Sequence, residues 1–147
     1  SLSIPVPKKI ILSAIALLLT ASYNVYAQDS SNSKEPEITF EKTTHNFGIF
    51  DIENGLQKCN FVFKNTGKKD LLILSATASC GCTEPEFPKV LIAPGASDTI
   101  KVTYDGTTRR PGVFRKVITL KTNAKVNTAY LYITGEMVEK MPAKPAN

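Results

Sequence analysis

The chain has 147 residues, of which 18 are Lys or Arg, 13 are Asp or Glu and three are Cys. This length suits one domain of ordinary size and is too short for two. A hydrophobic fraction of 42% beside a charged fraction of 21% excludes an intrinsically disordered protein, and three cysteines are too few for a small scaffold stabilised mainly by disulfides.

The N-terminal segment has the pattern of a secretory signal. A basic stretch ends at Lys9, an apolar run follows over residues 10–21, and Ala27 precedes Gln28 at a site of the kind that signal peptidase cleaves. The alternative is a membrane anchor, but a spanning helix needs about 20 apolar residues and this run is shorter. We therefore predict that residues 1–27 are removed, that no membrane span remains after cleavage, and that the mature protein is periplasmic or extracellular.

The rest of the chain divides into a linker, one domain and a tail. Residues 28–36 are polar and rich in serine, which is typical of a linker, and the Pro-rich residues 139–147 predict a disordered tail. Between them, residues 37–138 show short segments of alternating polarity, with a turn every ~8–12 residues. We predict that residues 37–138 form an all-β fold, a single immunoglobulin-like antiparallel β-sandwich of about seven strands.

Four of these strands are predicted in the first half of the domain, over residues 37–41, 45–50, 58–65 and 71–78. In the third strand, alternation places Cys59, Phe61 and Phe63 on one face, which we expect to be the core face. A turn is predicted over residues 51–55, where Asn54-Gly55 suits positive φ angles. A second, polar turn is predicted over residues 66–70.

Three further strands are predicted over residues 98–104, 113–122 and 128–135. Pro94-Gly95 and Pro111-Gly112 mark the turns that precede the first two of them. The alternation in the last strand places Tyr130 and Tyr132 on the face opposite the core. Between the halves, Glu84 and Glu86 flank Pro85 in what we predict to be a solvated loop.

Five segments in a fixed order resemble one family. They are HNFG, FVFKNTGKKDLLIL, SCGCTEPEFPK, IAPGASDTIKVTYD and YITGEM, within residues 38–136. Together they resemble a bacterial exported family known as a domain of unknown function (number fifteen seventy-three). Cys80 and Cys82 match the family's Cys-Gly-Cys, whereas Cys59 does not belong to its pattern. The family is similar to the immunoglobulin-like major sperm protein and Hydin-type domains, so the resemblance implies a structural or protein-binding module and no established biochemical activity.

The three cysteines leave several pairings open. In an oxidising compartment an odd count leaves at least one thiol free or paired between chains. If segments 57–65 and 71–79 pair around the intervening turn, Cys59 faces the end that leads into Cys80, and a bridge needs their Cα atoms within about 7 Å. A bridge from Cys59 to Cys82 is the second arrangement. A bridge between Cys80 and Cys82 closes a very small ring, which we expect to be strained and easily reduced, and Gly81 is expected to allow a tight turn.

A metal-binding or redox role is the more specific alternative for the Cys-Gly-Cys motif. Thiolates two residues apart favour Cu(I) or Zn, but a closed zinc site needs four ligands. The remaining donors are the single His45, which we expect to be structural, and carboxylates such as Glu84. We therefore expect no metal, with Cys80 and Cys82 as the candidates should one bind, and no cofactor. No nucleophile, zinc-protease or nucleotide-binding motif occurs, which argues against an enzyme.

These observations favour an exported structural or interaction module. We expect its partner to be another protein or an envelope glycan, reached through loops or through a strand edge that accepts another strand. A glycan would need an exposed aromatic platform, for which Tyr130 and Tyr132 are the candidates. The basic residues Arg109, Arg110, Arg115 and Lys116 are expected to form a solvated strand face, so no nucleic acid partner is predicted.

Overall fold

The computed structural model describes residues 34–140. The predicted leader, most of the predicted linker, and residues 141–147 of the predicted tail lie outside the described residues. The described part of the chain contains eight strands and one short 3-10 helix. In chain order they are β1 (Ile38–Phe40), β2 (Thr44–Asp51), η1 (Ile52–Asn54), β3 (Leu56–Asn65), β4 (Ile73–Ala78), β5 (Thr83–Glu86), β6 (Ser97–Asp105), β7 (Gly112–Thr122) and β8 (Thr128–Val138).

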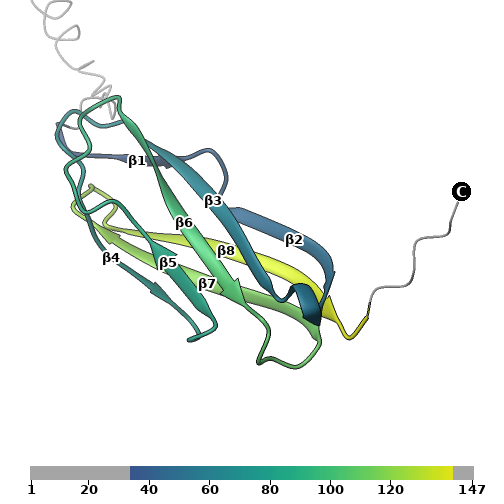
Figure 1. Ribbon diagram of the computed structural model, residues 1–147. Coiled ribbons are helices and arrows are strands. Elements are labelled where there is room, and N and C mark those ends of the chain that lie inside the picture. Colours follow the sequence, from purple (N-terminus) through teal and green to yellow (C-terminus); the bar gives the residue numbers. More distant parts are fainter. Residues whose placement is uncertain (1–33, 141–147) are drawn as a thin grey trace, which may run out of the picture. The chain divides into compact units, whose positions relative to one another are not determined.

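The strands form two packed sheets (Figure 1). One sheet has the order β1-β3-β6-β5 and the other β2-β8-β7-β4. Neighbouring strands are antiparallel except for β2 and β8, which pair in parallel. The predicted all-β, immunoglobulin-like sandwich is therefore confirmed. The strand missing from the prediction is β5, because Glu84-Pro85-Glu86 lies in an edge strand and not in a loop.

The core lies between the inner faces of the sheets. In β3, Cys59, Phe61 and Phe63 are buried and alternate with exposed or half-buried side chains, as the sequence pattern predicts. The strands β6, β7 and β8 contribute buried residues in the same alternating way. Full burial of an aliphatic or aromatic side chain contributes about 1.5–3 kcal/mol, so these alternating faces supply most of the drive for packing the sheets together.

The pairing of segments 57–65 and 71–79, on which a bridge from Cys59 to Cys80 depends, does not form. The strand β3 pairs with β1 and β6, whereas β4 pairs with β7 in the opposite sheet. The chain between them leaves one sheet at Asn65 and joins the other at Ile73. A polar turn between two strands permits either a hairpin or such a crossing. Here the chain crosses, because β3 and β4 bury their apolar faces from different sheets.

The glycines of two predicted turns have different backbone conformations. The turn at Pro94-Gly95 is confirmed, because the N–H of Ala96 donates to the carbonyl of Ala93 at 3.0 Å and Gly95 has a φ of 80°. The turn after β2 is also present, but Gly55 has a φ of −63°, so the expected positive φ angle is wrong. A Cβ at Gly55 would lie 2.9 Å from the N atom of Thr107, so close backbone approach explains this glycine.

Candidate functional site

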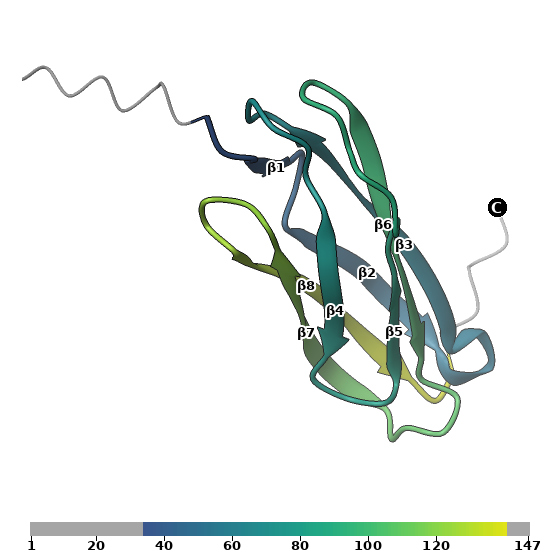
Figure 2. The ribbon, with the colours of Figure 1, turned by 90° about the vertical axis from the view of Figure 1, so that its left-hand side faces the viewer.

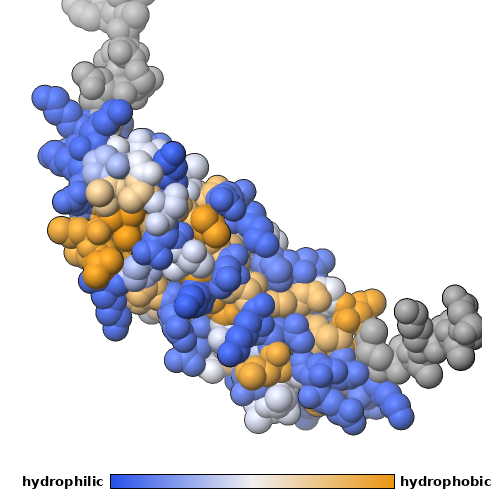
Figure 3. All heavy atoms as spheres, turned by 45° about the horizontal axis from the view of Figure 1, so that its top comes forward, coloured by the Kyte–Doolittle hydropathy of each residue, from blue (hydrophilic) through white to orange (hydrophobic). Residues whose placement is uncertain are grey.

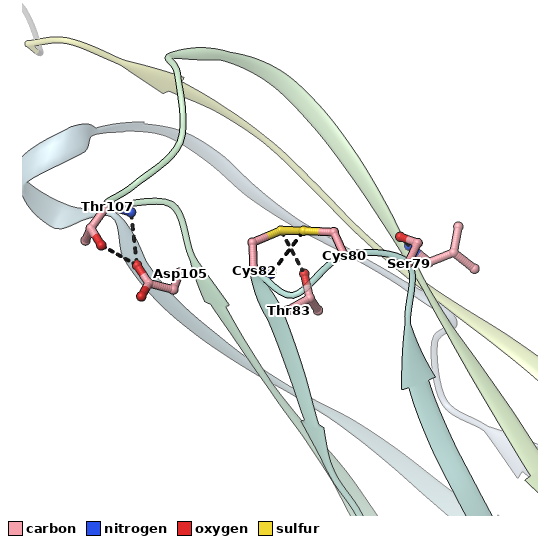
Figure 4. Close-up of a disulfide and its surroundings, with 7 residues drawn as sticks. Ser79, Cys80, Cys82, Thr83, Asp105 and Thr107 are labelled. Atoms are coloured by element: carbon pink, nitrogen blue, oxygen red, sulfur yellow. Dashed lines mark hydrogen bonds between the residues drawn. A yellow bond between two sulfur atoms is a disulfide. The ribbon is translucent and has the colours of Figure 1, made fainter.

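The turn between β4 and β5 carries a disulfide. Figure 4 shows Cys80 and Cys82 joined through their sulfur atoms, and their Cα atoms lie 5.3 Å apart. The N–H of Thr83 donates to the carbonyl of Cys80 at 3.2 Å and closes the turn. The N–H of Cys82 lies 3.1 Å from the Sγ atom of Cys80. The two sulfur atoms therefore lie where the chain passes from one sheet to the other.

The two sulfurs differ in their surroundings. Cys82 is 5% exposed and belongs to the core, whereas Cys80 is half-buried against it. Gly81 between them is exposed, and its φ lies outside the region that favours glycine. No heavy atom lies within 4 Å of the place where a Cβ on Gly81 would stand. Gly81 lies in the expected tight turn, but the backbone there does not need a glycine.

The third cysteine, Cys59, is a buried free thiol on the inner face of β3. Burial raises its pKa to about 11, an effect that the positive charge of Lys42 opposes. The thiol is therefore protonated at neutral pH and a poor nucleophile. The conceivable bridges from Cys59 to Cys80 or Cys82 do not form, because Cys80 pairs with Cys82 and the Cys59 thiol stays free.

The potential metal donors are dispersed. Within residues 34–140, no three His, Cys, Asp or Glu side chains come together as a metal-binding group. His45 lies at the start of β2, with its Nδ1 atom 3.0 Å from Lys42 Nζ. Burial, and then the charge of Lys42, lower the pKa of this histidine. Glu84 and Glu86 project from the outer face of β5. In the disulfide form, moreover, the cysteines offer no thiolate to a soft metal ion.

The tyrosines of β8 lie on the outer face of their sheet, as predicted. Tyr130 is 52% exposed. The guanidinium of Arg115 lies 4.2 Å from the centre of the Tyr132 ring. This cation–π contact covers one face of that ring. The pair therefore offers less free aromatic surface for a sugar than the sequence suggests.

The basic residues near β7 do not share one strand face. Arg109 and Arg110 are exposed in the turn before this strand. Arg115 lies on the outer face of β7, and Lys116, the next residue, points to the opposite face and is half-buried. The expected single solvated strand face is therefore wrong, and the four charges are spread over a turn and two faces.

Four strands form the open edges of the two sheets, and three of them carry features that discourage pairing with another chain. The strand β1 is only three residues long. The strand β2 contains a register shift between Asn46 and Ile49, where Gly48 has a φ of 72°. The strand β5 contains Pro85, which has no N–H to donate, between two glutamates.

The remaining edge strand, β4, shares a register irregularity with β2, but it is longer than β1 and contains neither a proline nor a glycine with positive φ. Its sequence ILSATA contains no proline, glycine or charge. After an irregularity between Ile73 and Ser75, it pairs regularly with β7 as far as Ala78. Figure 2 shows β4 beside β5, at the edge of the sandwich that faces the viewer. In the described domain, β4 is therefore the edge best suited to accept a further strand.

Exposed apolar side chains gather around the start of β4. Leu71 exchanges backbone hydrogen bonds with Ile92. The N–H of Leu72 donates to Oδ1 of Asn123 at 2.8 Å, and the carbonyl of Leu72 accepts the N–H of Asn123 at 3.1 Å, so the segments before β6 and after β7 flank this point. Figure 3 shows apolar side chains concentrated on the side of the domain where β4 lies. The exposed members of this apolar surface, as we define it, are Leu74, Val90, Leu91 and Val126. At the opposite edge of the same sheet, Ile49 and Val113 line a depression of about 240 Å³.

A family model matches residues 38–137 of the chain. Its description is "Protein of unknown function (DUF1573)". The chain belongs to the DUF1573 family. The resemblance seen in the sequence is therefore confirmed, and the matched range covers all eight strands of the DUF1573 domain except the final residue of β8. No curated protein matches the sequence. In the described range, no helix is long and apolar enough to cross a bilayer.

Several solved structures resemble the DUF1573 domain in fold. A protein of unknown function from Porphyromonas gingivalis W83 is 15% identical with a TM-score of 0.62, over 76% of this chain and 51% of that one. The ASH/PapD-like domain 7 of human CEP192 is 11% identical with a TM-score of 0.56, over 77% and 93%. The periplasmic chaperone SfaE is 8% identical with a TM-score of 0.53, over 74% and 61%. At such identities the likeness shows the fold alone, and the chain spans about half the length of the Porphyromonas protein.

Proposed function

We propose that this chain is an exported, non-enzymatic interaction module that binds an extended segment of another protein along the open edge of β4. The observation that carries the proposal is the regular, uncharged stretch of β4 from Ser75 to Ala78. The other edge strands are short, contain a glycine with positive φ at an irregularity, or contain proline. The names of two neighbours support a role in protein binding, since SfaE is a periplasmic chaperone and the CEP192 domain is PapD-like. The predicted leader supports export.

The backbone of β4 provides the groups that such a partner would bind. The N–H of Ser79 donates to the carbonyl of Val117 at 3.0 Å, so this residue faces β7. The polar groups of successive strand residues point to opposite sides, so Ala76 and Ala78 direct their N–H and C=O groups to the open edge. An incoming strand would satisfy these groups as it would in a sheet.

The side chains near this edge indicate the chemistry of the partner. Leu74 is 58% exposed at the start of the open segment, and Leu91 of the adjoining apolar surface is exposed to a similar degree. The strand itself offers only Ser75 and Thr77 besides aliphatic residues. The partner segment is therefore extended and uncharged, with an apolar side chain that reaches Leu74 and no proline opposite Ala76.

The test is a photo-crosslinking amino acid placed at Thr77 in the cell of origin. We expect a discrete adduct with one protein. Its yield should fall at least about tenfold with Ala76→Pro, because proline removes an edge N–H and its ring obstructs the partner. Ala76→Ser keeps the N–H and should keep the adduct. An adduct that survives Ala76→Pro, or that forms equally from Lys58 on the outer face of β3, contradicts the proposal. Should Ala76→Pro misfold, Leu74→Lys tests the same edge.

Export is tested by the mass of the chain recovered from intact cells and from the cell exterior. We expect a protein that begins at Gln28, because cleavage follows Ala27. Ala27→Leu should leave the leader attached, since the bulky side chain no longer suits the peptidase, whereas Asn24→Ala should be processed normally. A full-length chain confined to the cytoplasm would show that the segment is not a signal.

A further inference from the structure

The disulfide turn is held in place by bonds that do not involve its sulfur atoms. Before it, the N–H of Ser79 donates to the carbonyl of Val117 at 3.0 Å, which ties the turn to β7. After it, the N–H of Asp105 donates to the carbonyl of Cys82 at 2.8 Å, which ties it to the end of β6. The bond from Thr83 to Cys80 closes the turn itself. Opening the disulfide therefore leaves two thiols already positioned to close again.

The two sulfurs are suited to different steps of thiol exchange. Cys80 is the more accessible, and the N–H of Cys82 points at its Sγ atom from 3.1 Å. An N–H donor stabilises a thiolate more than a thiol, which lowers the cost of ionising Cys80. Cys82 is buried, with its Sγ atom 3.7 Å from the hydroxyl of Thr83. Access therefore favours Cys80 as the sulfur that meets an incoming thiol, and charge stabilisation favours its later release as a thiolate.

The spacing of the cysteines also favours exchange. One residue separates them, so the disulfide closes a very small loop. In the chain-entropy model, cross-links that close small loops stabilise a fold least. The described domain has its own core of two packed sheets, so its fold does not depend on this bond. We therefore expect the folded protein to tolerate the opening of this disulfide.

We propose that Cys80 and Cys82 form a redox site whose substrates are the thiols of another molecule. A substrate thiolate attacks Cys80 Sγ, forms a mixed disulfide and releases Cys82 as a thiolate, which takes up a proton. A second substrate thiolate then attacks the substrate sulfur of the mixed disulfide and releases Cys80. Two electrons pass from the two substrate thiols to the protein, giving one substrate disulfide and two protein thiols. The exchange is stoichiometric, with one protein disulfide consumed for each substrate disulfide formed, and the inference does not depend on the proposed binding of a strand at β4.

The first test equilibrates the oxidised wild-type protein in mixtures of reduced and oxidised glutathione, followed by alkylation and mass mapping. We expect Cys80 and Cys82 to become alkylated together as the fraction of reduced glutathione rises, while circular dichroism shows a folded domain throughout. Cys59 should stay unmodified, since it is buried and protonated. A disulfide that opens only after the protein is unfolded would overturn the proposal and identify the bond as structural.

The second test compares two single-cysteine forms of the turn against oxidised glutathione. Cys82→Ser leaves the accessible Cys80, which should form a mixed disulfide at least about tenfold faster than Cys82 does in the matched Cys80→Ser variant. Equal rates, or faster reaction at Cys82, would overturn the assignment of Cys80 as the reacting sulfur. The glutathione titration uses the wild-type protein. It can therefore still refute the proposal if either variant fails to fold.

Discussion

Replacing Asn65 with alanine is expected to lower the free energy of unfolding by about 3 kcal/mol or more. The side chain is fully buried at the end of β3. Its Nδ2 atom donates to the carbonyls of Lys69 and Ile92, each at 2.8 Å, and its Oδ1 atom accepts the N–H of Gly67 at 3.0 Å. Alanine leaves these backbone groups without the partner that Asn65 provides, and a buried unsatisfied group costs about 1–3 kcal/mol.

Urea denaturation of the two variants Asn65→Ala and Asn60→Ala provides the measurement. Asn60 is exposed on the outer face of the same strand, so its replacement should change the free energy of unfolding by less than about 0.5 kcal/mol. A small loss at both positions would show that water replaces the hydrogen bonds of Asn65 without cost. Both variants replace asparagine with alanine in the same strand. The difference between their free energies of unfolding therefore reports the burial and the hydrogen bonds of Asn65.

Asn65 also explains how the proposed binding edge is built. Its bonds hold the crossing segment at Lys69 and the segment at Ile92, and Ile92 in turn exchanges hydrogen bonds with Leu71 just before β4. One buried amide thus links the end of β3 in the first sheet to the start of β4 in the second. The Asn-Thr-Gly motif, which the sequence shows only as part of a family resemblance, has a clear structural role in this link.

The faces of the strands could be predicted from the sequence because side-chain direction alternates along any strand, whatever its neighbours. Cys59, Phe61 and Phe63 in β3 illustrate this, as do Tyr130 and Tyr132 in β8. Strand pairing could not be predicted in the same way. The polar segment after Asn65 is compatible with a hairpin and with a crossing to the other sheet. Only the packing of the two sheets against each other distinguishes these two arrangements.

The candidate site shows the same division. The sequence singles out Cys80 and Cys82 but leaves three pairings open, because the distance between Cys59 and the motif depends on which sheet holds β4. The strand β5 escaped prediction because Pro85 disfavours a central strand, and it fits here only because β5 is an edge. The open edge of β4 carries no sequence motif at all, since it follows from strand order. A run of six residues without charge, proline or glycine is the one local signal that points to it.

Replacing Gly67 with alanine is expected to lower the free energy of unfolding by about 2–4 kcal/mol. A Cβ at this position would come into severe contact with the carbonyl O atom of Glu35 and the N atom of Glu37. Both are backbone atoms, so no side-chain rotation relieves the contact. The two segments are also joined by backbone hydrogen bonds, from Thr66 to Glu37 at 2.9 Å and from Lys68 to Glu35 at 3.1 Å. The methyl group must therefore separate segments that these bonds hold together.

Gly81→Ala in the disulfide turn is the matched control. Gly81 is exposed, has no heavy atom within 4 Å of the place where the methyl group would stand and does not need a positive φ angle, so the change should cost less than about 0.5 kcal/mol. Thermal or urea denaturation of both variants gives the comparison. Equal destabilisation would mean that Gly81 supports the turn in a way its backbone geometry does not require. Because the same residue type is replaced by the same methyl group, a large loss at Gly67 alone assigns the effect to close backbone packing next to the Asn65 amide, and not to the general loss of glycine flexibility.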